Sequence, residues 1–114
     1  MVREELMVGD WVMFNNVVDK VQEIYGKVGN AYLQKYGTIE ISRLSPIPLT
    51  TKILKKNGFN ETSWGGEWTN DNVDFILIEH NDGFRMIDTN IVLLGVHHFQ
   101  HALRLCNIDK EIEI

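Results

Sequence analysis

Three of the four histidines in this chain lie within five residues, at His97, His98 and His101. Imidazole is a common metal ligand, and two histidines spaced i, i+4 on a helix can hold one ion between them. His97 and His101 have that spacing, so a metal-dependent enzyme is one function that this segment could support. The alternative is that the histidines coat the surface of an amphipathic helix.

The residues around the pair favour the second interpretation. A helical projection at 100° per residue places His97, Gln100, His101 and Arg104 on one polar face. The opposite face carries apolar residues and the single cysteine: Val96, Phe99, Ala102, Leu103 and Cys106. His98 lies at the border, beside Leu105. No glutamate follows the first histidine as in zinc proteases, and Arg104 adds a fixed positive charge. We therefore expect a contact face for a partner, with Cys106 packed in the core.

Trp64 and Trp68 form a second candidate surface, on either side of Gly65-Gly66. They could make an aromatic platform for a sugar, a base or a peptide proline. A cross-strand pair that closes over its own sheet is the more ordinary interpretation, and we favour it. Both tryptophans are kept as candidate binding residues.

No other pattern points to catalysis. The acidic residues are not paired as acid–base catalysis requires, and Gly26-Lys27-Val28-Gly29-Asn30 lacks the spacing of a phosphate-binding loop. No serine occupies a nucleophile elbow. The sequence therefore predicts no catalytic residue, no cofactor and no metal beyond the weak candidates His97 and His101, and it favours a protein that is not an enzyme.

Composition limits the partners further. The 114 residues carry a net charge of −5, which disfavours non-specific binding to phosphates. The nearest approach to a basic patch is Lys52, Lys55 and Lys56. One cysteine, no signal peptide and no apolar run long enough to span a bilayer indicate a cytoplasmic protein without a membrane partner.

The elements that position these residues follow from turn and capping signals. Strands are expected within 6–14, 17–25, 32–36 and 38–41, with a reversal at Asn15-Asn16, and again at 73–79 and 84–87. A short helix after Pro46 and Pro48 should be capped by Thr50 or Thr51 and end at Gly58, and a second helix should cover 93–107. Disorder is expected only in residues 109–114, where Glu111 and Glu113 fit an exposed tail.

The fold class predicted is α+β in one domain of 114 residues. It has an N-terminal antiparallel β-meander over 1–45, which we expect to be SH3-like. Residues 46–114 hold the short helix, a second meander and the C-terminal amphipathic helix. The oligomeric state does not follow from the sequence.

Three segments together resemble a known group of proteins. Pro46 to Phe59 is similar to a "PIPLT-x-x-IL-x-K-x-GF" run, Val96 to Gln100 to a "VHxLQNL" segment, and Leu6 to Val12 to an "LRIGNxV" start. These motifs belong to small uncharacterised proteins of Bacteroidetes genomes, often in prophages and mobile elements. His97 and Gln100 match the pattern, whereas His98 and His101 stand where it has Gln and Asn. The resemblance implies no activity.

These observations predict a non-enzymatic accessory or interaction protein of a phage or mobile element, whose partner is a protein. Its binding surface would comprise His97, Gln100, His101 and Arg104, together with Trp64 and Trp68. Nucleic-acid binding through an SH3-like sheet is the alternative, and a metal-dependent enzyme that uses the C-terminal histidines is the third.

Overall fold

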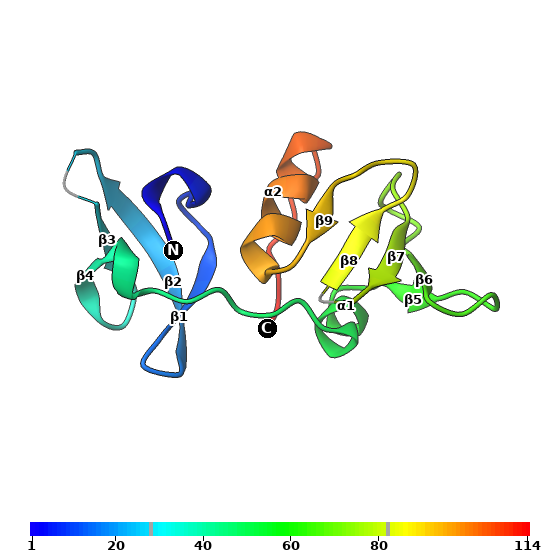
Figure 1. The fold of residues 1–114 in the computed structure, drawn as a ribbon, viewed down its shortest axis with the longest axis horizontal. Coiled ribbons are helices and arrows are strands. Elements are labelled where there is room, and N and C mark those ends of the chain that lie inside the picture. Colours follow the sequence, from blue (N-terminus) through cyan, green and yellow to red (C-terminus); the bar gives the residue numbers. More distant parts are fainter. Residues whose placement is uncertain (28, 82) are drawn as a thin grey trace. The chain divides into compact units, whose positions relative to one another are not determined.

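A computed structural model describes residues 1–27, 29–81 and 83–114 of the chain (Figure 1). It has an α+β fold, as predicted, with two antiparallel sheets of four and five strands. The chain divides into two compact units, Met1–Ile47 and Pro48–Ile114, close to the predicted boundary at Pro46. In the part of the chain that the structure describes, no helix is long and apolar enough to cross a membrane.

The first unit is a meander in the order β1-β2-β3-β4. Its elements are a 3₁₀ turn (Arg3–Glu5), β1 (Trp11–Phe14), β2 (Val17–Tyr25), β3 (Asn30–Leu33), β4 (Gly37–Glu40) and a second 3₁₀ turn (Ile41–Arg43). The predicted reversal at Asn15-Asn16 is confirmed, because both residues have positive φ, +49° and +62°, as a tight hairpin turn requires.

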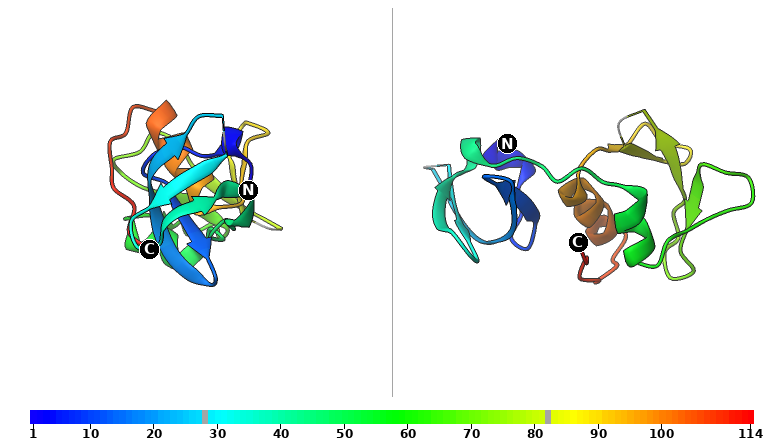
Figure 2. Two further views of the ribbon diagram at one scale, coloured as in Figure 1. Left: turned by 90° about the vertical axis from the view of Figure 1, so that its left-hand side faces the viewer. Right: turned by 90° about the horizontal axis from the view of Figure 1, so that it is seen from below.

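Two features bend this sheet into a ring (Figure 2). A bulge between Val21 and Glu23 interrupts the β2–β3 register. After the second 3₁₀ turn, Ser45 pairs with Met13 of β1 through two backbone hydrogen bonds of 2.8 Å. The ring encloses eight buried apolar side chains: Leu6, Val12, Phe14, Val21, Ala31, Leu33, Ile41 and Leu44.

Asp19 orders the turn between β3 and β4 from inside this unit. Its buried carboxylate accepts hydrogen bonds from the backbone amides of Lys35, at 3.0 Å, and Tyr36, at 3.2 Å. A buried carboxylate needs such donors, so this acid is structural.

The second unit is a five-stranded meander with two helices. Its elements are α1 (Thr51–Lys56), β5 (Asn60–Glu61), β6 (Glu67–Thr69), β7 (Leu77–His80), β8 (Gly83–Met86), β9 (Val92–Leu93) and α2 (Val96–Leu105). The sheet order is β5-β6-β7-β8-β9, so β5 and β9 are its two edges. Phe59 lies in the core, with its ring centroid 5.5 Å from that of Phe99.

Several predicted elements differ in extent. The strand expected over 73–79 begins only at Leu77, because Asn70 accepts the backbone amides of Asn72 and Val73 and prolongs the preceding turn. The helix expected over 93–107 begins at Val96, because Val92 and Leu93 pair with β8. Val28, within the glycine-rich segment Gly26 to Asn30, and Asp82, between the strands predicted at 73–79 and 84–87, lie outside the described residues.

The last residues are ordered against the end of α1, while Glu111 and Glu113 are exposed as predicted. The Asn57 side chain accepts a hydrogen bond from the Glu113 amide and donates one to the Glu113 carbonyl, both at 2.8 Å. Ile112 is buried. The sequence did not reveal this contact because its partner, Asn57, lies far away in the chain.

Candidate functional site

The histidine segment lies on α2, and its first turn is fixed by a side chain. His98 Nδ1 accepts a hydrogen bond from the Gly95 amide at the helix N-terminus, at 3.3 Å. Amides at this position have no partner within the helix, so His98 satisfies one of them. Gly95 is itself tied to the segment before α1 through its bridge with Pro48.

Two of the predicted surface residues are buried. His97 and Gln100 are 0% and 7% exposed, although the projection placed both on an open polar face with His101 and Arg104. His101 and Arg104 keep part of their surface exposed. Over the first two turns of α2, Val96, His97, Phe99 and Gln100 are all buried, so the helical projection did not predict the environment of His97 and Gln100.

Cys106 is exposed, contrary to the prediction of core packing. The helix ends at Leu105, and Asn107 takes a positive φ of +58°. The Ile108 amide then bonds back to the Leu103 carbonyl at 2.9 Å, which is a Schellman ending. Cys106 is therefore the C-cap residue and no longer follows the helical projection.

The imidazole of His97 lies against those of both His98 and His101. The ring centroids of His97 and His98 are 4.0 Å apart, and those of His97 and His101 are 5.8 Å apart in an edge-to-face arrangement. Among the described residues of the second unit, no three histidine, cysteine or carboxylate ligand atoms gather closely enough to share an ion. The His97–His101 pair thus has the predicted proximity, and this unit does not complete a metal site around it.

An apolar groove runs between α2 and the β8–β9 edge of the sheet, where Figure 1 shows α2 beside β9. Its volume is about 400 Å³. The residues that line it are Met86, Ile91, Val92, Leu93, His98, His101, Ala102, Leu105 and Cys106. Leu105, 83% exposed, and Ile91, 50% exposed, stand at its open side. This groove is the candidate functional site.

The groove contains one predicted site residue, His101, and several that the sequence analysis missed. Its β9 wall was missed because Leu93 was assigned to the helix. The run Ile91-Val92-Leu93 has two β-branched residues in succession, which is the signal that indicates a strand there. The position of His98 beside Leu105 is confirmed, since both line the groove.

The two tryptophans do not form the predicted pair. Trp68, in β6, is opposite Glu61 and is 2% exposed, and its indole N–H donates to Glu79 Oε1 at 3.0 Å. Trp64 lies in the turn before β6 and is 87% exposed. The glycines at 65 and 66 belong to that turn, so Trp64 falls outside the strands and has no position opposite Trp68.

The three lysines of the predicted basic patch are partly used within the chain. Lys55 Nζ lies 5.8 Å from the centroid of the Trp68 ring. Lys56 Nζ donates to the Ile114 carbonyl at 3.0 Å. Both contacts direct positive charge toward the second unit itself, so a phosphate backbone would meet a weaker patch than the sequence indicates.

On the first unit, the outward face of β2 and β3 carries exposed tyrosines beside acidic residues. Tyr32 is paired with Glu23, and Tyr25 lies two residues from Glu23 on the same face. A hydrogen bond with Glu23 is the main cause that raises the pKa of the exposed Tyr25 hydroxyl, and the Glu23 charge adds to it. The aromatic rings could stack on bases, but the adjoining carboxylate repels phosphates.

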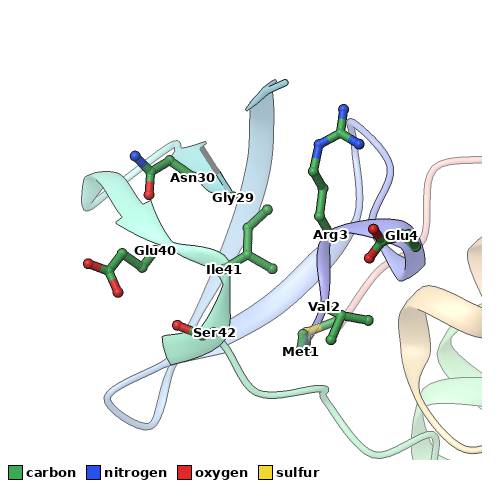
Figure 3. Close-up of a pocket in the computed structure, with 9 residues that line it drawn as sticks. All are labelled: Met1, Val2, Arg3, Glu4, Gly29, Asn30, Glu40, Ile41 and Ser42. Atoms are coloured by element: carbon green, nitrogen blue, oxygen red, sulfur yellow. The ribbon is translucent and has the colours of Figure 1, made fainter. Parts of the chain in front are cut away.

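A second hollow, of about 500 Å³, lies on the first unit (Figure 3). It is lined by Met1, Val2, Arg3, Glu4, Gly29, Asn30, Glu40, Ile41 and Ser42. The charged ends of Arg3, Glu4 and Glu40 point in different directions in Figure 3. They do not converge on one ligand position, so this hollow offers less to a specific partner than the groove.

Comparison with known proteins identifies no relative: no protein-family model, no curated protein and no solved structure matches the chain.

Proposed function

We propose that this chain is a non-enzymatic interaction protein whose second unit receives an apolar side chain of a partner protein in the α2–β9 groove. The observation that carries the proposal is the groove's lining, which is apolar except for His98, His101 and the Cys106 thiol. No lysine, arginine, aspartate or glutamate is among its lining residues in the part of the chain that the structure describes. Such a site gains affinity by removing apolar surface from water.

The size of the groove supports a small anchor. Ligand pockets in proteins span roughly 300–1,000 Å³, and this one has about 400 Å³. One large aliphatic or aromatic side chain would occupy much of it. The exposed Leu105 and Ile91 would then contact the residues that flank the anchor.

The accessory role in a phage or mobile element is also a proposal, which the motif resemblance supports. The motif residues that the structure describes have structural roles: Thr50 caps α1, and Leu54 and Phe59 are buried. His97 and Gln100, which match the pattern, are buried as well. His98 and His101, which depart from it, line the groove. We infer that the partner specificity of this chain resides in these two positions.

Nucleic-acid binding by the first unit is the second candidate, and we propose an SH3-like barrel for that unit. The 3₁₀ turn before Ser45 and the Ser45–Met13 pairing support the barrel, and exposed Tyr25 and Tyr32 on one face support base stacking. Binding of oligothymidylate or duplex DNA that weakens steeply with added salt would support this candidate. Undetectable binding at low salt would remove it.

The groove proposal is tested by selection from a random peptide library on the immobilised protein. Leu105→Glu places a charge in the groove wall, and its exposed position makes the change compatible with folding. Leu94→Glu is the matched control, because Leu94 is 47% exposed and is not among the lining residues. We expect selected peptides with one large apolar anchor to bind the wild type and Leu94→Glu, and to lose at least tenfold in affinity for Leu105→Glu, about 1.4 kcal/mol. Peptides that bind all three proteins equally, or no enrichment at all, would contradict the proposal.

A further inference from the structure

Trp64 is the most exposed large apolar residue among those that the structure describes, with 87% of its surface accessible. It lies in the turn between β5 and β6. Tryptophan is strongly buried on average in folded proteins, and exposed tryptophans are enriched among the residues that anchor protein interfaces. The high exposure of Trp64 is therefore unusual and needs an explanation.

The turn that carries Trp64 is fixed by hydrogen bonds. The Thr62 amide donates to the Glu67 carbonyl at 2.8 Å, and the Gly66 amide donates to Glu61 Oε2 at 2.7 Å. Gly65 and Gly66 have φ of +77° and +70°, which glycine adopts without strain. The indole is thus presented on a preorganised support, and less conformational entropy is lost when it binds.

Trp64 and the apolar groove lie at opposite edges of one sheet. The turn joins β5 and β6 at one edge, and the groove is lined by residues of β9 at the other edge. Figure 1 shows β5 and β9 on opposite sides of the sheet. With strands about 4.8 Å apart, the five-stranded sheet separates its edges by about 19 Å. Trp64 therefore cannot enter the groove of its own chain, whereas the Trp64 of another copy can.

We propose that the groove of one copy receives Trp64 of a second copy. This inference rests on the proposed function, since it assigns an occupant to the same groove. The indole has the apolar character that the groove lining selects, and a volume of about 400 Å³ accommodates one large ring.

Charge does not oppose a contact between two copies at the point where Trp64 and the groove would meet. The second unit has six lysines and arginines against ten aspartates and glutamates, so the net charge of the unit makes two copies repel each other. Neither the turn segment Thr62-Ser63-Trp64-Gly65-Gly66 nor the lining of the groove contains a charged lysine, arginine or carboxylate group. The two features that would meet are thus places where the repulsion is smallest.

The arrangement fixes the kind of assembly. The indole and the groove are different surfaces, so the contact is heterologous and joins copies head to tail. In a pair of copies, the indole of one copy and the groove of the other remain unused. The association therefore extends beyond a dimer unless a ring closes. A contact built on one side chain buries less than the roughly 1,200 Å² typical of stable interfaces, so the association should be weak and depend on concentration.

The test measures the mass of the untagged full chain by sedimentation velocity between about 20 μM and 1 mM, a range chosen for the weak association expected of small interfaces. Trp64→Ala removes the indole, Leu105→Glu blocks the groove, and Leu94→Glu is the control. We expect the wild type and Leu94→Glu to form species larger than dimers as concentration rises. Each of the other variants alone should stay monomeric. An equimolar mixture of Trp64→Ala and Leu105→Glu should form dimers that grow no further, because only one intact indole and one intact groove can meet.

A wild type that stays monomeric at 1 mM, or a mixture without dimers, would overturn the self-association. The peptide selection separates this result from a failure of the proposed function. Peptides that bind in a Leu105-dependent way would retain the groove as a docking site for another protein, whereas their absence would remove the groove proposal as well.

Discussion

Asn57 connects α1 to the last residues of the chain through a single side-chain amide. Its Nδ2 donates to the carbonyls of Ile53 and Glu113, and its Oδ1 accepts from the Glu113 amide, each at 2.8 Å. The side chain is buried, so these bonds have little competition from water. Asn57 thus acts on the tail as a neighbouring strand would, by pairing with both backbone groups of one residue.

Asn57→Asp should therefore destabilise the protein although it preserves the shape of the side chain. A carboxylate cannot donate, and it would leave two buried carbonyls facing a negative charge. We expect the free energy of unfolding to fall by about 2–4 kcal/mol, measured by urea denaturation. Amide hydrogen exchange in residues 109–114 should also accelerate. Asn60→Asp, an exposed position on β5, is the control and should change stability by less than about 0.5 kcal/mol; equal effects at both sites would contradict the role of Asn57.

The β8–β9 pairing depends on the absence of a side chain at Gly83. A Cβ added there would lie 2.3 Å from the Leu93 carbonyl oxygen, which belongs to the backbone and cannot turn aside. Leu93 also lines the groove. The position of β9, and with it one wall of the candidate site, is therefore set by this close approach.

Gly83→Ala should move β9 and lower the free energy of unfolding by about 1–3 kcal/mol, the usual cost of overpacking. The same change should weaken the binding of groove-selected peptides. Gly26→Ala is the matched control, because a Cβ at Gly26 meets nothing within 4 Å and its φ is not in the left-handed region. Urea denaturation of both variants checks the prediction, and an unchanged midpoint for Gly83→Ala would refute it.

The two helices show what local sequence signals can predict. The ends of α1 were predicted because each depends on nearby residues: Thr50 Oγ1 accepts the Ile53 amide, Gly58 has a φ of +87°, and the Phe59 amide returns to Leu54. The end of α2 uses the same geometry with Asn107 in place of glycine. This weaker signal was overlooked, and Cys106 was assigned to the wrong environment.

Burial around α2 could not be predicted in the same way. A helical projection gives the angle between side chains, but it does not say how many sides of the helix the rest of the fold covers. His97 and Gln100 are polar and yet buried, and the groove arises where β9, a strand of two residues, lies beside α2. The position of β9 depends on its pairing with β8, which a helical projection does not include.

Each of the two units has buried apolar residues of its own. In the second unit they include Trp68, Phe59, Phe99, Leu54 and Leu103. We expect a fragment spanning Pro48–Ile114 to fold alone, because its 67 residues exceed the size of about 40 below which small domains need staples. Cooperative thermal unfolding by circular dichroism and dispersed amide resonances would verify this. A fragment that melts without a transition would show that the second unit depends on the first.

Cys106 is the only cysteine of the chain, and it is exposed at the wall of the groove. A fluorophore or spin label attached to this thiol would report directly on the candidate site, with no engineered cysteine and no competing reaction elsewhere. The single thiol of the chain thus lies where a spectroscopic label would detect binding in the groove.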